Sequence, residues 1–223
     1  MSKLILIPTP IGNLADITQR SVEALKSVDL ILCEDTRRTI KLLNHLDIKK
    51  TLKSFHKFNE HSLIQKIINE LESGKNIGLV SDAGTPGISD PGYLIVKNCI
   101  EKDIKIECLP GPTALIPALV VSGLPCERFI FEGFFPVKKG RKTRLEELSN
   151  EKRTMVFYES PYKLIKTLND FKSSFGDNRV ISVSKEISKI HETVFRGSIN
   201  NVLLELEEAK IKGEYVIVVN GLK

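Results

Sequence analysis

The chain has 223 residues, of which 41% are hydrophobic and 27% are charged. This balance is typical of globular proteins and excludes a disordered or collagen-like chain. The formal charge of +5 is too small on its own to indicate a nucleic-acid partner. Four cysteines without a C-x-x-C spacing favour free thiols, and no apolar run reaches the ~18 residues of a membrane span. We therefore expect a cytoplasmic protein without a membrane partner.

The first half of the chain alternates short apolar runs with amphipathic stretches. The runs predict buried strands, and the stretches carry apolar residues at helical spacing. Because parallel strands need long crossovers, the alternation predicts a parallel sheet with helices on both faces. The expected strands are 4–8, 30–33, 51–55, 77–81 and 104–109, and the expected helices are 18–28, 36–46, 62–73 and 91–102.

The pattern changes after Ala118. Gly123 and Pro125 lie between two structured stretches and predict a domain boundary. Strands 179–184 and 193–196 have no helix between them, so we expect an antiparallel pair in a mixed sheet. The other expected elements are strands 129–131, 154–158 and 215–219, and helices 142–150, 162–174 and 200–211. The sequence thus predicts two α/β domains, 1–120 with a mainly parallel sheet and 121–223 with a mixed sheet.

Ligands of open α/β sheets bind beyond the carboxyl ends of the strands, so the segments after the strands form the candidate site. The most unusual is DAGTPGISDPG, residues 82–92, with three glycines and two prolines. Such a backbone can bring main-chain N–H and C=O groups close to a small molecule. The same residues also predict a turn into a helix, with Ser89 or Asp90 as N-cap and Pro91 at the first helical position. The two interpretations are compatible, as they are for PGPTA at 110–114, where Thr113 is the expected cap.

The chain has neither G-x-x-x-x-G-K-[ST] nor a G-x-G-x-x-G after the first strand. A P-loop nucleotidase and a dinucleotide site therefore lack their usual phosphate cradles. A cofactor without phosphates fits better, and S-adenosylmethionine is one whose groups a backbone can recognise.

Charged residues follow two further strands. Glu34 and Asp35 can cap a helix, but Arg37 and Arg38 in the same turn oppose its dipole unless they face an anion, which favours a functional role. His56 and the nearby His61 alone make a poor metal site, so no metal is expected.

Two further segments have open interpretations. Phe55 and Phe58 belong more often in a core than against a nucleic-acid base. The basic run 138–144 is either solvated charge or a contact for phosphates.

These segments resemble the ribosomal small subunit methyltransferase I family, which belongs to the tetrapyrrole-methylase-like S-adenosylmethionine enzymes. The matching segments run almost from end to end. They are TPIGNLADIT (9–18), CEDTRRT (33–39), SFHKFNE (54–60), SDAGTPGISDPG (81–92), LPGPTA (109–114), FEGFFP (131–136), FYESPYK (157–163), KEISKIHET (185–193) and GEYVIVVNG (213–221).

The resemblance implies 2′-O-methylation of a cytidine ribose in small-subunit (16S-type) ribosomal RNA, free or in the assembled subunit. It also implies S-adenosylmethionine as the donor, a cofactor site between two domains and a homodimer. The implied cofactor contacts are Pro10, Ser81, Asp82, Gly84, Thr85, Ile88, Thr113, Ala114, Tyr158 and Glu214. One departure is Lys185, where the family usually has Arg, and Lys would hold a phosphate less specifically.

Methyl transfer to a weakly acidic hydroxyl benefits from a base or a cationic neighbour. We expect Glu34 or Asp35 near the hydroxyl, with Arg37 and Lys57 holding phosphates and Arg37 counted as the third catalytic residue. The other candidate bases are His56, Asp82 and Glu159. The expected RNA-binding residues are Arg37, Arg38, His56, Lys57, Lys138, Lys139, Arg141 and Lys142.

The charge distribution agrees with an RNA partner. Residues 36–58 hold seven basic residues and one acidic residue, a net +6, and residues 137–153 hold seven and three, a net +4. The remaining chain is therefore acidic, at −5. The two basic segments, one in each expected domain, predict a path for RNA.

Three alternatives remain open from the sequence. A small-molecule methyltransferase of the tetrapyrrole type would share the cofactor loops without needing the basic segments. A non-catalytic RNA-binding ribosome-assembly factor would need the basic segments without the loop 82–92. A Rossmann-type oxidoreductase would bind a nicotinamide instead.

Overall fold

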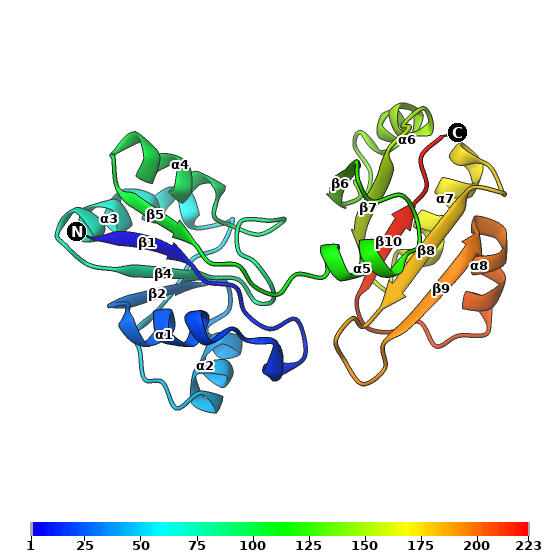
Figure 1. Cartoon of the computed structure of the whole chain (residues 1–223). Coiled ribbons are helices and arrows are strands. Elements are labelled where there is room, and N and C mark those ends of the chain that lie inside the picture. The colour runs from blue at the N-terminus through cyan, green and yellow to red at the C-terminus, as the bar shows by residue number, and fades with distance from the viewer. Residues whose placement is uncertain (1, 223) are drawn as a thin grey trace. The chain divides into compact units, whose positions relative to one another are not determined.

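The computed structural model describes residues 2–222 and divides into two compact units, Met1–Thr113 and Ala114–Lys223. Each unit is a five-stranded sheet with helices packed on it (Figure 1), so the expected class of two α/β domains is confirmed. The boundary lies before helix α5 (Leu115–Val121), whereas the sequence placed it after residue 120. Helix α5 belongs to the second unit because it packs on strands β7 (Thr154–Glu159) and β10 (Tyr215–Val219).

The sheet of the first unit is entirely parallel, as expected. Its strand order is β3-β2-β4-β1-β5, so β1 lies between β4 and β5, with Leu4 opposite both Ile77 and Ile106. The strands are β1 (Lys3–Leu6), β2 (Leu30–Cys33), β3 (Leu52–Ser54), β4 (Ile77–Val80) and β5 (Lys105–Cys108).

Four helices cover both faces of this sheet. Helices α1 (Gln19–Ser27) and α2 (Thr36–His45) share one core cluster with the strand residues of one face, and α3 (Glu60–Glu72) and α4 (Tyr93–Glu101) share another. Successive side chains of a strand point to opposite faces, which is why Leu4 joins the α3–α4 side whereas its neighbour joins the α1–α2 side. Helices that follow adjacent strands thus leave on opposite faces.

The second unit has a mixed sheet with the order β6-β7-β10-β8-β9. Strand β6 is parallel to β7, and the other pairs, including the predicted β8–β9 pair, are antiparallel. The remaining strands are β6 (Phe129–Phe134), β8 (Val180–Lys185) and β9 (Thr193–Ser198).

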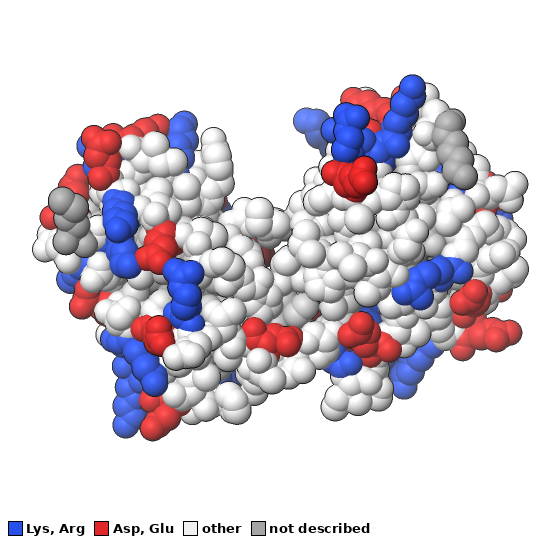
Figure 2. Space-filling model, in the orientation of Figure 1, with Lys and Arg blue, Asp and Glu red and all other residues white. Residues whose placement is uncertain are grey.

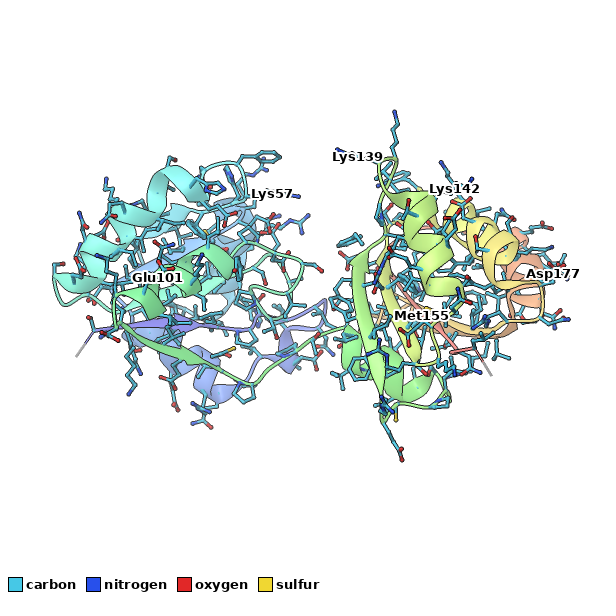
Figure 3. All side chains as sticks on the ribbon, turned by 90° about the horizontal axis from the view of Figure 1, so that it is seen from above. Lys57, Glu101, Lys139, Lys142, Met155 and Asp177 are labelled. Atoms are coloured by element: carbon cyan, nitrogen blue, oxygen red, sulfur yellow. The ribbon has the colours of Figure 1, made fainter. Side chains whose placement is uncertain are left out.

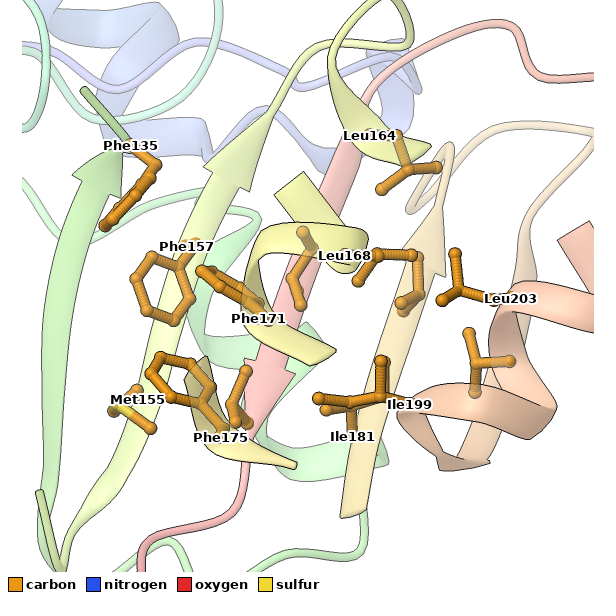
Figure 4. Packing of buried hydrophobic residues seen from close by; sticks show 14 of the residues in the cluster. Phe135, Met155, Phe157, Leu164, Leu168, Phe171, Phe175, Ile181, Ile199 and Leu203 are labelled. Atoms are coloured by element: carbon orange, nitrogen blue, oxygen red, sulfur yellow. The ribbon is translucent and has the colours of Figure 1, made fainter. Parts of the chain in front are cut away.

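Helices α6 (Arg141–Ser149), α7 (Leu164–Phe175) and α8 (Ile199–Glu207) bury one face of this sheet. Figure 4 shows residues of α7 and α8 in this core. Phe171 of α7 is fully buried, with its ring centroid 4.8 Å from that of Phe157 and 5.0 Å from that of Phe175. Such aromatic packing fixes α7 on the sheet. In the described part of the chain, no helix is both long and apolar enough to cross a membrane.

Candidate active site

The carboxyl edge of the first sheet gathers most of the predicted site residues. Strands β1 and β2 feed helices on one face, whereas β4, which lies between them, feeds α4 on the other. Such a reversal opens a crevice at the strand ends. A pocket of about 230 Å³ lies there, and its lining includes Pro10, Arg38, Lys41, Ser81 and Asp82. Residues from three separate segments of the sequence therefore meet at one place.

Hydrogen bonds fasten the loops after β1, β4 and β5 together. The backbones of Thr9 and Gly84 exchange two hydrogen bonds of 2.9 Å, and the buried Ser81 hydroxyl lies 3.2 Å from the Gly84 carbonyl oxygen. The Thr85 hydroxyl donates to the Pro112 carbonyl at 3.2 Å. The loop after β4 is thus hydrogen-bonded both to the loop after β1 and to the loop after β5.

The loop 82–92 needs unusual backbone conformations. Gly84 and Gly87 have φ values of +83° and +85°, and Ser89, which is not glycine, has +63°. A positive φ at a non-glycine residue costs free energy, and such residues are often found at functional sites. The N–H groups of Gly87, Ile88 and Ser89 donate no hydrogen bond within residues 2–222, and Ile88 is partly exposed. Free backbone donors beside an apolar side chain fit a small polar ligand with an apolar part.

Two predicted helix starts were wrong. Helix α4 begins at Tyr93 with Gly92 as its N-cap, so neither Ser89 nor Asp90 caps it and Pro91 precedes it. Helix α5 begins after Ala114, which makes no side-chain capping bond, so Thr113 is not its cap. The Asp90 carboxylate is therefore available for another role.

The arginines at the start of α2 face carboxylates of this chain. Asp35 caps α2, accepting from the backbone N–H of Arg37 at 2.9 Å and from the Arg37 guanidinium at 3.0 and 2.7 Å. These hydrogen bonds hold the pKa of Asp35 at about 2. Asp82 accepts from the Asp35 N–H at 3.0 Å and lies 3.4 Å from Arg38 Nε. These two carboxylates thus compensate the unfavourable interaction of Arg37 and Arg38 with the positive end of the helix dipole.

Glu34 and Asp90, unlike Asp35 and Asp82, have carboxylates without a partner in the described chain. Their carboxylates form no hydrogen bond or ion pair with residues 2–222. Burial, and then the charge of Asp82, raise the pKa of Glu34, against the lowering effect of Lys57. Burial, followed by the charges of Glu34 and Asp82, raises the pKa of Asp90 to about 6. The site therefore contains two carboxyl groups with free oxygens, and the charge of Glu34 helps to raise the pKa of Asp90 to about 6.

From the sequence, Asp90 is expected only to cap a helix. The sequence Ser-Asp-Pro-Gly that ends the loop (89–92) is also typical of a helix start, so the pattern alone does not indicate a catalytic carboxylate. The proximity of Asp90 to Glu34 depends on the tertiary fold, because β2 and β4 are adjacent in the sheet although their last paired residues, Cys33 and Val80, are 47 positions apart in the sequence.

Three predicted cofactor residues belong to the second unit. Ala114 lies at the start of α5, and Tyr158 on β7 packs edge-on against Phe131, with ring centroids 5.0 Å apart. The Glu214 carboxylate accepts a hydrogen bond from Lys189 Nζ at 2.8 Å. The structure places these residues on the second unit, and the other seven predicted cofactor contacts lie on the first.

Arg141 does not fit its predicted role in RNA binding. Its guanidinium donates to Asp170 at 2.7 Å, to the Pro136 carbonyl at 2.7 Å and to the Thr167 hydroxyl at 3.0 Å, and the residue is only 9% exposed. The Thr167 hydroxyl in turn donates to the buried Glu159 at 2.6 Å. This prediction was wrong because the side chain turns inward and joins α6 to α7.

Replacing Arg141 by Ala is expected to lower the free energy of unfolding by about 3 kcal/mol, the low end of the range for breaking a buried ion pair, because Asp170 is partly exposed. Urea unfolding followed by circular dichroism measures this change. The matched control is Lys139→Ala on the exposed start of the same segment, with an expected change within about 0.5 kcal/mol. Equal losses in the two variants would contradict the structural role of Arg141.

The other basic residues near α6 remain exposed. Lys138, Lys139 and Lys142 all lie on the surface, and basic side chains gather over α6 in Figure 2. Figure 3 shows Lys139 extending away from the second unit, and Lys57 at the carboxyl edge of the first. Each unit therefore carries exposed cations that can contact phosphates.

Comparison with known proteins first defines the class. The family model described as Tetrapyrrole (Corrin/Porphyrin) Methylases matches residues 3–203. The fold is similar to that of a diphthine synthase crystal structure, with a TM-score of 0.76 and 13% identity over 98% of this chain and 90% of that one. The chain is a methyltransferase of the tetrapyrrole methylase fold.

Several curated relatives carry the name Ribosomal RNA small subunit methyltransferase I, among them the following two. That of Thermotoga maritima is 47% identical over 221 residues, 99% of both chains. That of Synechocystis sp. is 46% identical over 222 residues, 99% of this chain and 80% of the relative. This chain belongs to the ribosomal RNA small subunit methyltransferase I family.

Proposed function

We propose that the protein transfers a methyl group from S-adenosylmethionine to the ribose 2′-hydroxyl of a cytidine in small-subunit ribosomal RNA. We further propose that it acts in the cytoplasm as a homodimer. The family supports the reaction class and the RNA substrate. The observation that carries the chemistry is the pair of unpaired carboxyl groups, Glu34 and Asp90, beside cations at the carboxyl edge of the first sheet.

The cofactor contacts that we propose on the first unit are the loop 82–92 and its neighbours. The N–H groups of Gly87 and Ile88 are free to donate, and Thr85 holds the loop in place through Pro112. When bound, S-adenosylmethionine supplies an electrophilic methyl group. The full proposed set is Pro10, Ser81, Asp82, Gly84, Thr85, Ile88 and Thr113, with Ala114, Tyr158 and Glu214 from the second unit.

We assign the proton transfer to Asp90, with Glu34 beside it. A general base works best when its pKa is near the operating pH, and the pKa of Asp90, at about 6, meets this condition. Asp35, at about 2, is a much weaker base and shapes the turn that presents Glu34. Holding the hydroxyl in line with the methyl group can supply a further part of the rate enhancement, up to ~7–11 kcal/mol in aligned reactions.

The RNA phosphates are proposed to contact exposed cations of both units. On the first unit these are Arg37, Arg38, His56 and Lys57, of which Arg37 keeps an 86% exposed side chain despite its ion pair. On the second unit they are Lys138, Lys139 and Lys142. Arg141 is left out because it is buried.

Replacing Lys57 and Lys139 together by Ala is expected to weaken RNA binding and to reduce the slope of log K against log salt by about 1–2, roughly one per lost phosphate contact. Filter binding of small subunits at several salt concentrations measures this slope. Lys26→Ala on α1, at an exposed position outside both basic segments, is the control and should leave the slope unchanged. An unchanged slope in the double variant would place the RNA path elsewhere.

Isothermal titration calorimetry with S-adenosylmethionine tests the cofactor assignment. We expect saturable binding, and we expect S-adenosylhomocysteine, the product, to compete for it. Absence of binding would overturn the proposal. If binding is retained but labelled methyl groups enter a tetrapyrrole and not RNA, the protein is a small-molecule methyltransferase instead.

A further inference from the structure

Two aromatic side chains near the candidate active site are unusually exposed. Phe58 is 89% exposed and Tyr93 is 70% exposed, whereas Phe55, three residues before Phe58, is buried in the core at 1%. The interpretation of Phe55 and Phe58 as core residues therefore holds only for Phe55. Single exposed aromatic residues are common, so the position of these two decides their meaning.

Both residues lie at the carboxyl edge of the first sheet. Phe58 follows β3 and precedes α3 by two residues, and Tyr93 is the first residue of α4 after β4. Helices α3 and α4 pack together on the same face of the sheet, and both begin at its carboxyl edge. Packed helices lie roughly 8–10 Å apart, so their starting turns are neighbours.

The Asn59 side chain constrains the loop that carries Phe58. Asn59 accepts from the His56 N–H at 2.8 Å and donates to the Ser54 carbonyl at 3.2 Å, which ties the Phe58 loop to the end of β3. The His56 ring lies edge-on to Phe58, with centroids 6.0 Å apart. These contacts fix the loop from which the Phe58 ring projects.

The loop before Tyr93 is tightly packed. A Cβ atom on Gly92 would lie 3.1 Å from the Gly87 Cα, so the loop is folded tightly on itself there. Tyr93 therefore projects from a fixed point.

The aromatic residues adjoin the proposed catalytic pair. Lys57 Nζ lies 6.0 Å from the centre of the Phe58 ring, and the Lys57 charge acts on both Glu34 and Asp90. Asp90 is itself only three residues before Tyr93. Cations for phosphates and aromatic faces for bases are the two parts of a single-strand binding site.

Resting on the function proposed above, we propose that Phe58 and Tyr93 stack on bases of the single-stranded RNA that flank the target nucleotide. Sequence-specific proteins bind RNA mainly where bases are unstacked, and aromatic side chains then replace the lost base stacking. Charge favours RNA over a second copy of the chain, because Phe58 is the last residue of the segment 36–58, which carries a net +6, and Lys57 lies beside its ring.

The first test compares Phe58→Leu and Tyr93→Leu, which keep apolar bulk but remove the aromatic face. With small subunits that lack the modification as substrate, we expect each change to raise KM for the subunit about 5- to 150-fold, the effect of losing one base stack. The affinity for S-adenosylmethionine and the salt slope should stay at wild-type values. Phe58→Tyr should keep the wild-type KM.

The control is Ile100→Ala, an exposed apolar residue at the other end of α4. Figure 3 places its neighbour Glu101 far from Lys57 within the first unit. This variant should behave as wild type in every measurement.

The second test uses the absence of tryptophan from the chain. Phe58→Trp gives a protein with one tryptophan, and its fluorescence should be quenched when small subunits bind and a base stacks on the indole.

The result that overturns the inference is unchanged KM in both leucine variants, or fluorescence that does not respond to a bound substrate. A shift in sedimentation from dimer to monomer would instead assign the two rings to an interface between copies. If the wild-type protein methylates no RNA at all, the proposed function fails first, and the two failures are thereby distinguished.

Discussion

Asp90→Asn is expected to slow methyl transfer by about 10²- to 10⁴-fold at neutral pH, the range for loss of a general base. The amide keeps the shape of the side chain but cannot accept the proton. In the wild-type protein the rate should rise with pH through about 6, where Asp90 ionises, and then level off. Single-turnover rates between pH 5 and pH 8 measure this profile, and the variant should lose its inflection near pH 6.

Glu34→Gln serves as the comparison for this profile. The negative charge of Glu34 raises the pKa of Asp90, so its removal should move the inflection to lower pH while leaving it visible. If Asp90→Asn retains both the wild-type rate and the inflection, the base lies elsewhere. If only Glu34→Gln abolishes the inflection, Glu34 takes the proton and Asp90 is its neighbour.

The same titration predicts how stability varies with pH. The pKa of Asp90 is higher in the folded chain than the ordinary value of 3.8, so the folded state binds more protons than the unfolded state between about pH 4 and pH 6. The contribution of Asp90 to the free energy of unfolding therefore falls as pH rises through this window. Asp90→Asn should remove that fall, which denaturant unfolding can detect without any substrate.

The second large effect is expected at Thr85. Thr85→Lys removes the hydroxyl that donates to the Pro112 carbonyl at 3.2 Å and places a long cationic side chain in the loop 82–92. We expect affinity for S-adenosylmethionine to fall about 100-fold or more, equivalent to about 2.7 kcal/mol, measured by calorimetry. Affinity for small subunits should change little, because Thr85 is not among the proposed RNA contacts.

Thr85→Ser is the matched control, since it keeps the hydroxyl. It should bind S-adenosylmethionine as the wild-type protein does. Equal loss of cofactor and RNA affinity in Thr85→Lys would show that the loop is needed for the fold and does not bind the cofactor specifically.

Periodicity in the sequence predicted the sheets well. Leu30–Cys33 and Tyr215–Val219 are strands with the expected bounds, and the β8–β9 pair is antiparallel as expected. Continuous apolar runs bounded by turn residues leave few other structures available. The carboxyl-edge rule then located the candidate site, because the strand order brings the loops after β1, β2 and β4 together.

Side-chain partners could not be predicted in the same way. Arg141 lies in a run that looks uniformly basic, yet it turns inward to Asp170, whereas Lys139 stays outside. Asp35 and Asp90 both precede helices, but only Asp35 is a cap. Such differences depend on contacts between distant parts of the chain, which local patterns do not contain.

The chemical position of the transferred methyl group tests the proposed reaction most directly. Small subunits that lack the modification are incubated with the protein and methyl-labelled S-adenosylmethionine, and their RNA is then hydrolysed in alkali. A 2′-O-methyl group removes the hydroxyl that attacks the adjacent phosphodiester, so the label should remain in an alkali-resistant dinucleotide whose 5′ nucleoside is cytidine. Label released in mononucleotides, as base methylation would give, or no label in RNA, would contradict the account.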